Sequence, residues 1–273
     1  MPSCGRLASL LVKIARFSVD SVAFSYGLVE GEPGAETIAA LHAHPLVEPV
    51  RLTGERFALR EVNLGAPVVP SKIVCVGRNY LEHVAEMAGS DGDAVPSVPL
   101  LFLKPSTAIV GPDAAIVLPP DSNRIDYEGE LAIIMGRITR RVAKEDALSA
   151  VFGYTCANDV TARDHQQADG QWTRGKGHDT FCPLGPWIET DLDPGLARVT
   201  TKLDGRTVQD APTSELIHDV ATVVAYISNA MTLLPGDVVL TGTPAGVGAL
   251  APGQVVAVTV DGIGTLANPV VAA

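Results

Sequence analysis

Cysteine is scarce in this sequence and shows no pattern. Only four occur among 273 residues, without a CxxC pair or a short ligand spacing: Cys4, Cys75, Cys156 and Cys182. Disulfide frameworks and structural zinc sites both need closely patterned cysteines, so neither is expected. Scattered thiols are typical of a reducing compartment, and we therefore expect a cytoplasmic protein.

Positive charge is also scarce. Lys and Arg number 20 against 31 Asp and Glu, which gives a formal net charge of −11. Because nucleic acids and anionic membranes are bound through basic patches, neither a nucleic-acid partner nor a membrane partner is expected. A small anionic substrate remains compatible with this charge, because a bound cation can invert the local field.

Long apolar runs are missing as well. No stretch is long enough to span a bilayer, and the apolar part of the opening segment MPSCGRLASLLV is too short for a convincing signal peptide. Regular strand-like alternation begins only at Lys13. Residues 1–11 are therefore interpreted as an extension, which a misassigned start codon would also explain.

Aromatic residues make up only 5% of the chain, whereas 26 Gly and 20 Pro are present. This composition predicts many turns and short strands, and thus a β-rich α+β fold. We expect a small β-rich N-terminal domain over residues 1–70 and a larger domain over residues 71–273. In the small domain, alternation over 13–29 predicts a hairpin, and residues 36–44 are expected to form a short helix closed by Pro45.

The pattern of apolar and polar residues changes at Ser71. Short apolar or alternating segments predict strands at 72–77, 99–105, 115–118, 128–136, 187–191, 200–205, 237–243 and 254–262. Helices are expected at 78–89, 144–151 and 214–234, the last with Ser214 as its N-cap. The polar, Gly- and Pro-containing stretch 89–99 is expected to be a mobile loop near the site.

The segment IDYEGELAIIMG carries two glutamates at alternate positions. In a strand such residues share a face, so Glu128 and Glu130 would point the same way. Buried like charges repel strongly unless a cation lies between them. The segment therefore indicates either a cation site or an exposed edge strand with a charged solvent face.

A third carboxylate favours the cation site. Asp159 follows a strand-like run of small and apolar residues in FGYTCANDVTARDHQ. An isolated Asp in this position is either a turn residue or a ligand. Together with the two glutamates it would complete an all-oxygen set, the kind that Mg²⁺ and Mn²⁺ prefer.

Six segments, in order, resemble the fumarylacetoacetate hydrolase family: VGRNYLEHVAEM, PLLFLKPSTAIVGP, IDYEGELAIIMG, GYTCANDVTARDHQ, RGKGHDTFCPLGPWI and LLPGDVVLTGTPAGVG. Within the family the chain is similar to the bacterial branch of 2-hydroxyhepta-2,4-diene-1,7-dioate isomerases, acylpyruvases and oxaloacetate decarboxylases. The resemblance is dense over residues 71–270 and loose before them.

The resemblance implies a fold, an assembly and a set of site residues. The larger domain would be a mixed β-roll catalytic domain, assembled as a homodimer. Mg²⁺ or Mn²⁺ would be held by Glu128, Glu130 and Asp159. The family's general base or acid is matched by His83, its orienting carboxylate by Glu86, its oxyanion-stabilising lysine by Lys176, and its substrate contacts by Arg163, Gln166 and Thr243. Without the resemblance, the basic and polar residues among these would be read as ordinary surface or loop side chains.

The implied chemistry concerns small 2-oxo or 2-hydroxy-enoic carboxylates and dicarboxylates. A metal-stabilised enolate would allow C–C bond hydrolysis, decarboxylation or dienoate isomerisation. These are reactions of the kind used in aromatic catabolism, and the sequence does not separate them. Specificity is expected to lie in the 88–99 loop, the N-terminal domain and residues 166–172.

Two alternatives remain open. A non-haem iron oxygenase needs two histidines and one carboxylate, for which His165 and His178 would have to join Asp159. A non-catalytic member of the fold would have kept the architecture and lost the chemistry. The complete set of expected site residues speaks against that alternative.

Deletion of residues 1–11 is predicted to leave stability and activity unchanged, because this stretch lacks the alternation that begins at Lys13. Thermal melting and activity of the truncated protein measure this. A large fall in the melting temperature would show that the segment packs against the fold.

Overall fold

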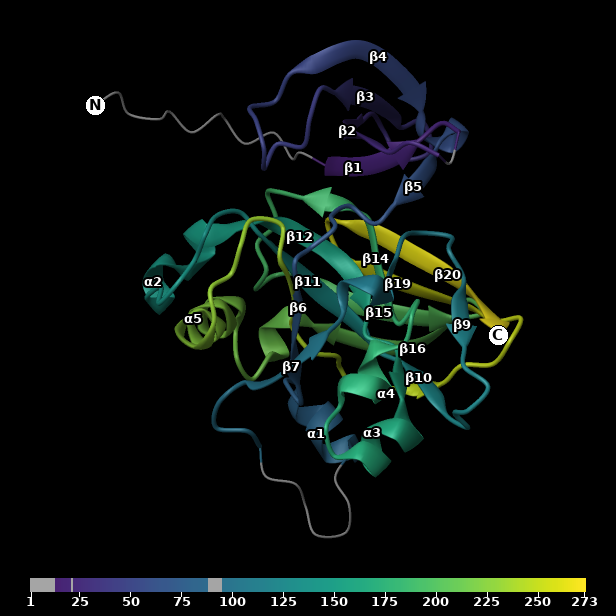
Figure 1. Ribbon diagram of the computed structural model, residues 1–273, viewed down its shortest axis with the longest axis vertical. Helices are drawn as coiled ribbons and strands as arrows, with labels where there is room; N and C mark the ends of the chain where they lie inside the picture. Colours follow the sequence, from purple (N-terminus) through teal and green to yellow (C-terminus); the bar gives the residue numbers. More distant parts are fainter. Residues whose placement is uncertain (1–12, 21, 88–94) are drawn as a thin grey trace.

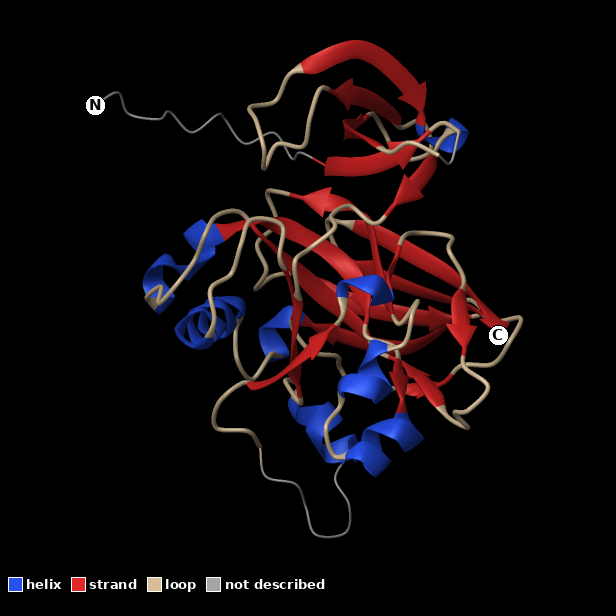
Figure 2. Cartoon of the chain, in the orientation of Figure 1, coloured by secondary structure: helices blue, strands red, loops and turns tan. Residues whose placement is uncertain are grey.

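Strands dominate the architecture of this computed structural model, which describes residues 13–20, 22–87 and 95–273 (Figure 1, Figure 2). The expected extension over residues 1–11 lies outside the described residues. So do residues 88–94, which include the end of the expected helix at 78–89 and the first part of the expected loop at 89–99. Most strand pairs are antiparallel. Parallel pairs join β17 (Val238–Leu240) to β6 (Ile73–Gly77), β20 (Gly264–Ala272) to β9 (Ile116–Leu118), and β14 (Cys182–Glu189) to β8 (Ile109–Val110). The expected β-rich fold with mixed sheets is confirmed.

A 12-stranded sheet runs through the described residues. Its strand order is β4 (Leu52–Ala58), β3 (Thr37–Leu41), β2 (Ser25–Glu30), β1 (Lys13–Ser18), β14 (Cys182–Glu189), β12 (Val151–Asn158), β11 (Gly129–Met135), β17, β6 and β7 (Leu100–Lys104), with β5 (Asn63–Gly65) on β1 and β8 (Ile109–Val110) on β14. The N-terminal strands enter this sheet where Lys13 and Ile14 pair with Glu189 and Ile188.

Two smaller sheets complete the β structure. One contains β13 (Thr161–Ala162), β10 (Ile125–Tyr127) and β18 (Gly248–Ala249). The other contains β16 (Arg206–Pro212), β15 (Arg198–Leu203), β19 (Val255–Val260), β20 and β9. The division of the chain at residue 70 stays a prediction, because β1 shares a sheet with strands from both sides of that boundary.

Helices are short. They are α1 (Leu81–Met87), α2 (Lys144–Ala147), α3 (Arg163–Asp169), α4 (Thr173–Gly177) and α5 (Val220–Ala230), with 3₁₀ turns η1 (Leu59–Glu61), η2 (Ser106–Ala108), η3 (Leu148–Ala150) and η4 (Thr213–Glu215). The helices α1, α3 and α4 gather at the end of the molecule away from the N-terminal strands (Figure 1). Among the described residues, no helix combines the length and the apolar character needed to cross a membrane.

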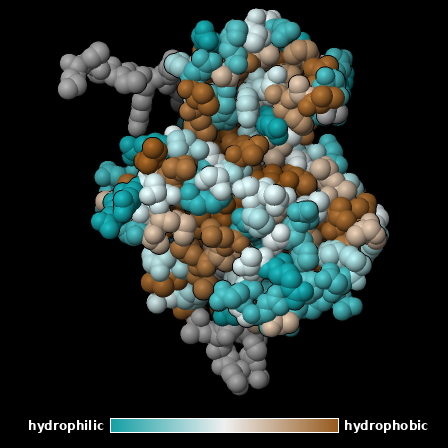
Figure 3. Space-filling model, in the orientation of Figure 1, coloured by the Kyte–Doolittle hydropathy of each residue, from teal (hydrophilic) through white to brown (hydrophobic). Residues whose placement is uncertain are grey.

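The core lies on both faces of the large sheet. Every residue of β11 is buried, and its side chains alternate between two apolar clusters, with Leu131 and Ile133 on one face and Ala132 and Ile134 on the other. This explains the continuous apolar run in the sequence, which is typical of a strand covered on both sides. On the surface, apolar side chains gather near the junction with the N-terminal strands, among hydrophilic ones (Figure 3).

The expectation of a helix over residues 36–44 was wrong. Residues Thr37–Leu41 form β3, which pairs with β2 and β4, and four of its five residues are buried. Short apolar runs fit a buried strand and a buried helix equally well, and pairing with neighbouring strands decides between them.

The long helix begins later than expected. Ser214 lies in η4, whereas the N-cap of α5 is Asp219, whose carboxylate accepts a 2.7 Å hydrogen bond from the Thr222 N–H. The intervening residues are held by buried Asn79, which receives a hydrogen bond from Ile217 N at its carbonyl and from His218 N at its side chain. These tertiary hydrogen bonds keep residues 216–218 out of the helix.

Candidate active site

Glu128 lies where the chain leaves one sheet and enters another. It separates β10, in the three-stranded sheet, from β11, in the large sheet. Its backbone N–H donates to Asn158 Oδ1 at 2.9 Å, and its carbonyl accepts from Asp159 N at 2.8 Å. A Cβ at Gly129 would lie 2.0 Å from Thr201 Oγ1, so this crossing requires glycine.

Three carboxylates converge at this crossing. Glu128, Glu130 and Asp159 each offer an oxygen within 4.8 Å of the others, and all three residues are buried. The Gly242 N–H donates to Glu130 Oε2 at 2.6 Å, which attaches the loop after β17 to the group. Two glutamates predicted to share a face and an Asp distant in sequence therefore meet at one point.

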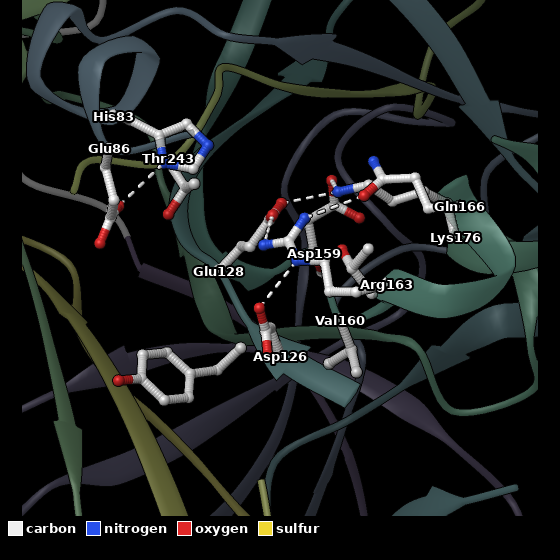
Figure 4. Close-up of polar contacts among 12 residues, drawn as sticks. His83, Glu86, Asp126, Glu128, Asp159, Val160, Arg163, Gln166, Lys176 and Thr243 are labelled. Carbon is white, nitrogen blue, oxygen red and sulfur yellow. Dashed lines mark hydrogen bonds and ion pairs between the residues drawn. The ribbon is translucent and has the colours of Figure 1, made fainter. Parts of the chain in front are cut away.

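Buried cations surround the carboxylates. The ammonium of Lys176, on α4, lies 2.6 Å from Glu128 Oε2 and 2.7 Å from Asp159 Oδ2 (Figure 4). Lys104, at the end of β7, lies 2.5 Å from Asp159 Oδ1 and also donates to the carbonyl of Val160. Charge pairing of this kind is what allows carboxylates to be ionised in an interior.

The neighbours of the two glutamates move their pKa values in opposite directions. Burial raises the pKa of Glu128, but Lys176 and Arg163 outweigh burial and hold it well below its usual range. Burial, reinforced by Asp159 and Glu128, raises the pKa of Glu130 well above its usual range. For Lys176, burial lowers the pKa, but Asp159 and Glu128 more than offset this and raise it.

The carboxylate group suits a divalent cation. Its donors are all oxygens and they converge. Burial, together with the two other carboxylates, raises the pKa of Glu130, which is the situation that a hard cation relieves. Within the described ranges, no other group of three His, Cys, Asp or Glu side chains comes this close together.

Arg163 connects the carboxylates to the start of α3. Its guanidinium donates to Asp126 Oδ2 at 2.8 Å, to Glu128 Oε1 at 2.5 Å and to Gln166 Oε1 at 3.1 Å. Burial lowers the pKa of Arg163, but Glu128 and Asp126 outweigh this and raise it. Arg163 and Gln166 thus lie at the site, with the guanidinium engaged by protein oxygens; their contact with substrate stays a prediction.

His83 and Glu86 form a pair on α1. The imidazole is buried, and its Nδ1 lies 3.3 Å from Glu86 Oε2. Both carboxylate oxygens of Glu86 accept from the Gly246 N–H at 3.1 Å, so the loop after β17 holds this side chain. Because a carboxylate only accepts, neutral His83 carries its proton on Nδ1, and its other nitrogen, Nε2, points into the site (Figure 4).

A cavity of about 350 Å³ brings these residues together. Its lining includes all of the predicted site residues except Glu86, which lies behind His83: His83, Glu128, Glu130, Asp159, Arg163, Gln166, Lys176 and Thr243. The Thr243 hydroxyl donates to the Gly129 carbonyl and accepts from Gln209 Nε2, at 2.9 and 2.8 Å. The structure therefore assembles the predicted set, and the individual roles remain predictions.

Sequence reasoning missed two charged residues. Asp126 is buried and holds Arg163, and it continues the alternation of Glu128 and Glu130, a signal that was present in the sequence. Lys104 is buried beside Asp159, and its only signal was a lysine at the end of an apolar strand.

The histidines of the iron alternative pair with each other. His165 Nδ1 and His178 Nε2 are 3.0 Å apart, and His165 Nε2 donates to the carbonyl of Asp121. Neither belongs to the convergent group that contains Asp159. The geometry of the described residues thus gives no support to a site of two histidines and one carboxylate.

Known proteins that are similar to this chain include the following three. The crystal structure of 2-hydroxyhepta-2,4-diene-1,7-dioate isomerase from Mycobacterium marinum is 46% identical, with a TM-score of 0.87, and the match covers 96% of this chain and 98% of that one. The mitochondrial oxaloacetate tautomerase Fahd2a of Rattus norvegicus is 39% identical over 223 residues, which cover 77% of this chain and 70% of the relative. Maleylpyruvate hydrolase from Sphingobium sp. SYK-6, solved in complex with manganese(II) ion and pyruvate, is 31% identical, with a TM-score of 0.75 and coverage of 95% and 99%.

Two family profiles match the sequence. The profile described as Rv2993c-like, N-terminal matches residues 12–67. The profile described as Fumarylacetoacetate (FAA) hydrolase C-terminal matches residues 72–271, which is well over half of the chain. The protein belongs to the fumarylacetoacetate hydrolase family.

Proposed function

We propose that the protein is a divalent-metal-dependent enzyme that shifts protons in small 2-oxo and 2-hydroxy-enoic carboxylates, by isomerisation or tautomerisation. The observation that carries this proposal is the convergence of three buried carboxylates beside Lys176 and His83 in one cavity. Two similar proteins are named for such reactions, an isomerase and a tautomerase.

Mg²⁺ or Mn²⁺ is the proposed cofactor. Glu128, Glu130 and Asp159 would hold it, and when bound it would supply a Lewis acid for the keto and carboxylate oxygens of the substrate. Oxygen donors alone do not separate the two ions. A similar hydrolase was solved with manganese and pyruvate, which makes manganese a reasonable first choice for experiments.

Each protein side chain has a defined task in the proposed reaction. Lys176 places a positive charge next to the substrate oxygen on which negative charge develops. Nε2 of His83 takes a proton from one carbon of the substrate and returns it at another position. Glu86 fixes the tautomer that leaves Nε2 free to accept, and Gly246 N fixes Glu86. Arg163, Gln166 and Thr243 would contact the substrate carboxylate and its neighbouring oxygen.

C–C bond hydrolysis is the second candidate. The similar maleylpyruvate hydrolase supports it, and the same histidine could activate water instead of abstracting a carbon-bound proton. Decarboxylation of a 3-carboxy-2-oxo acid would need the cation and Lys176 but make less use of His83. Homodimeric assembly and a cytoplasmic location stay proposals that rest on the sequence.

A substrate panel tests the proposed function. Oxaloacetate, an acylpyruvate and a 2-hydroxy-2,4-dienoate are each incubated with Mn²⁺, with Mg²⁺ and with EDTA. Proton shift is followed by absorbance, hydrolysis by acid release and decarboxylation by CO₂. We expect metal-dependent isomerisation or tautomerisation that EDTA abolishes. Activity that is unaffected by EDTA, or no activity on any member of the panel, would contradict the proposal.

Glu130→Gln is predicted to weaken Mn²⁺ binding by at least about 100-fold. This loss is larger than the loss typical of residues that only hydrogen-bond to a metal ligand. Folding should persist, because the neutral amide is close in size and shape to the protonated carboxyl that the raised pKa of Glu130 favours. Affinity of the wild-type protein should rise with pH, since the raised pKa of Glu130 means that a proton must leave before the ion binds. Calorimetry or EPR measures both effects.

The matched control for this variant is Glu189→Gln, a buried carboxylate in β14 outside the convergent group. It should bind Mn²⁺ as the wild type does. Equal binding by Glu130→Gln and the wild type would remove Glu130 from the ligand set.

His83→Ala is predicted to lower turnover about 100-fold or more, the usual scale for loss of a general base. Mn²⁺ affinity should be unchanged, because His83 is not proposed as a ligand. Glu86→Gln should lower turnover by a smaller factor, and exposed His42→Ala serves as the control. If the His83→Ala enzyme kept full activity on every substrate of the panel, His83 would have no part in the mechanism.

A further inference from the structure

The cavity has an aromatic side that the proposed chemistry does not use. Next to the carboxylates, the Lys176 ammonium lies 5.0 Å from the centroid of the Phe102 ring. Phe102 in turn meets Trp172 in a T-shaped contact, with ring centroids 5.2 Å apart and planes at 67°. Both rings line the cavity beside the charged residues. We call Phe102 and Trp172 the aromatic wall of the cavity.

Trp172 begins the helical turn that carries Lys176. The residue lies in the link between α3 and α4, directly before Thr173, and its carbonyl accepts a 2.9 Å hydrogen bond from Lys176 N. The turn that presents Trp172 therefore also presents the Lys176 ammonium. A substitution at Trp172 could therefore also move Lys176. An experiment has to separate that indirect effect from the loss of a contact between Trp172 and the substrate.

Gly77 supplies the space for the indole. It ends β6, and a Cβ built there would lie 2.8 Å from Cζ3 and 3.1 Å from Cη2 of Trp172. A contact this short cannot persist, and the atoms that would have to move are the outer edge of the Trp172 ring. A Cβ at position 77 would therefore push the indole away from its present position.

A flat aromatic surface recognises one kind of substrate chain better than another. Planar conjugated carbon chains gain dispersion and stacking contact with Trp and Phe rings, whereas a short polar chain gains little. The cation held by the carboxylates, together with Lys176 and Arg163, would bind the 2-oxo or 2-hydroxy acid end of every substrate alike. The wall therefore distinguishes substrates by what lies beyond that end.

We propose that Trp172, seated over Gly77, is a specificity-determining residue that selects 2-hydroxy-enoic acids with a flat conjugated chain over short 2-oxo acids such as oxaloacetate. This inference rests on the proposed function and narrows its substrate class. Trp172 contacts the chain of the substrate and takes no part in moving protons.

The experiment compares kcat/KM for two substrates, a 2-hydroxy-2,4-dienoate and oxaloacetate, in Trp172→Ala, Trp172→Phe and Gly77→Ala. For Trp172→Ala we expect a loss of about tenfold or more on the dienoate, mainly in KM, and a change of less than about twofold on oxaloacetate, in line with the size of an aromatic contact. Trp172→Phe should recover most of the loss. Gly77→Ala should reproduce it without changing Trp172 itself.

Trp187→Phe is the matched control, because this indole donates to the Ile263 carbonyl and does not line the cavity. It should leave the ratio of the two kcat/KM values unchanged. Circular dichroism melting shows whether each variant folds. If Trp172→Ala does not fold, the comparison is made with Trp172→Phe and Gly77→Ala.

Equal losses on both substrates would overturn the inference, since they would mean that Trp172 acts only by supporting Lys176. Unchanged kcat/KM on the dienoate would overturn it as well. Calorimetry provides a comparison that does not depend on turnover. It measures the binding of the dienoate and of oxalate, which here stands in for the short 2-oxo acid, to the Mn²⁺-loaded variants. Selective loss of dienoate binding, with no turnover of either substrate by the wild type, would support this inference and contradict the proposed function.

Discussion

Three carboxylates buried within 4.8 Å of one another form the constraint on which the rest of this structure depends. Like charges at such distances, taken out of water, destabilise a folded chain by several kcal/mol unless cations accompany them. Here the cations come from three separate elements: Lys104 from β7, Arg163 from α3 and Lys176 from α4. Ion pairs therefore attach these elements to the strands at one point, and a change to any carboxylate affects the position of several elements.

The same point is where regular sheet structure is interrupted. A strand that continued from β10 through Glu128 into β11 would keep both glutamates in one sheet; instead the chain crosses between two sheets, with Gly129 beneath Thr201. The crossing frees the backbone of Glu128 to bond Asn158 and Asp159 across from it. Local rules of strand continuity are broken where the function is proposed to lie, which is where such conflicts are expected.

Much of the site could be predicted because its signals are local in the sequence. The period-two spacing of Glu128 and Glu130 survives in the structure, and the i,i+3 spacing of His83 and Glu86 becomes a hydrogen-bonded pair. Lys104 could not be found in this way, because only the packing of β7 against α4 and the end of β12 makes it a neighbour of Asp159. The predictions of a helix over residues 36–44 and of a helix that begins at Ser214 failed for the same reason, because contacts with distant residues decided the local conformation. Thr37–Leu41 pairs with β2 and β4, and Asn79 holds the residues before α5.

The charges around the cavity fit the proposed reaction through their placement. The three convergent carboxylates face three cations, Lys104, Arg163 and Lys176. The proton that His83 would take stays in the cavity, so breaking the C–H bond separates charge without changing the total. Negative charge would develop at a substrate oxygen beside Lys176, and positive charge at His83, whose Nδ1 lies 3.3 Å from Glu86 Oε2. Fixed charges act strongly on such a separation in an interior of low polarity, so the same burial that makes the carboxylate group costly would favour the charge distribution of the proposed transition state.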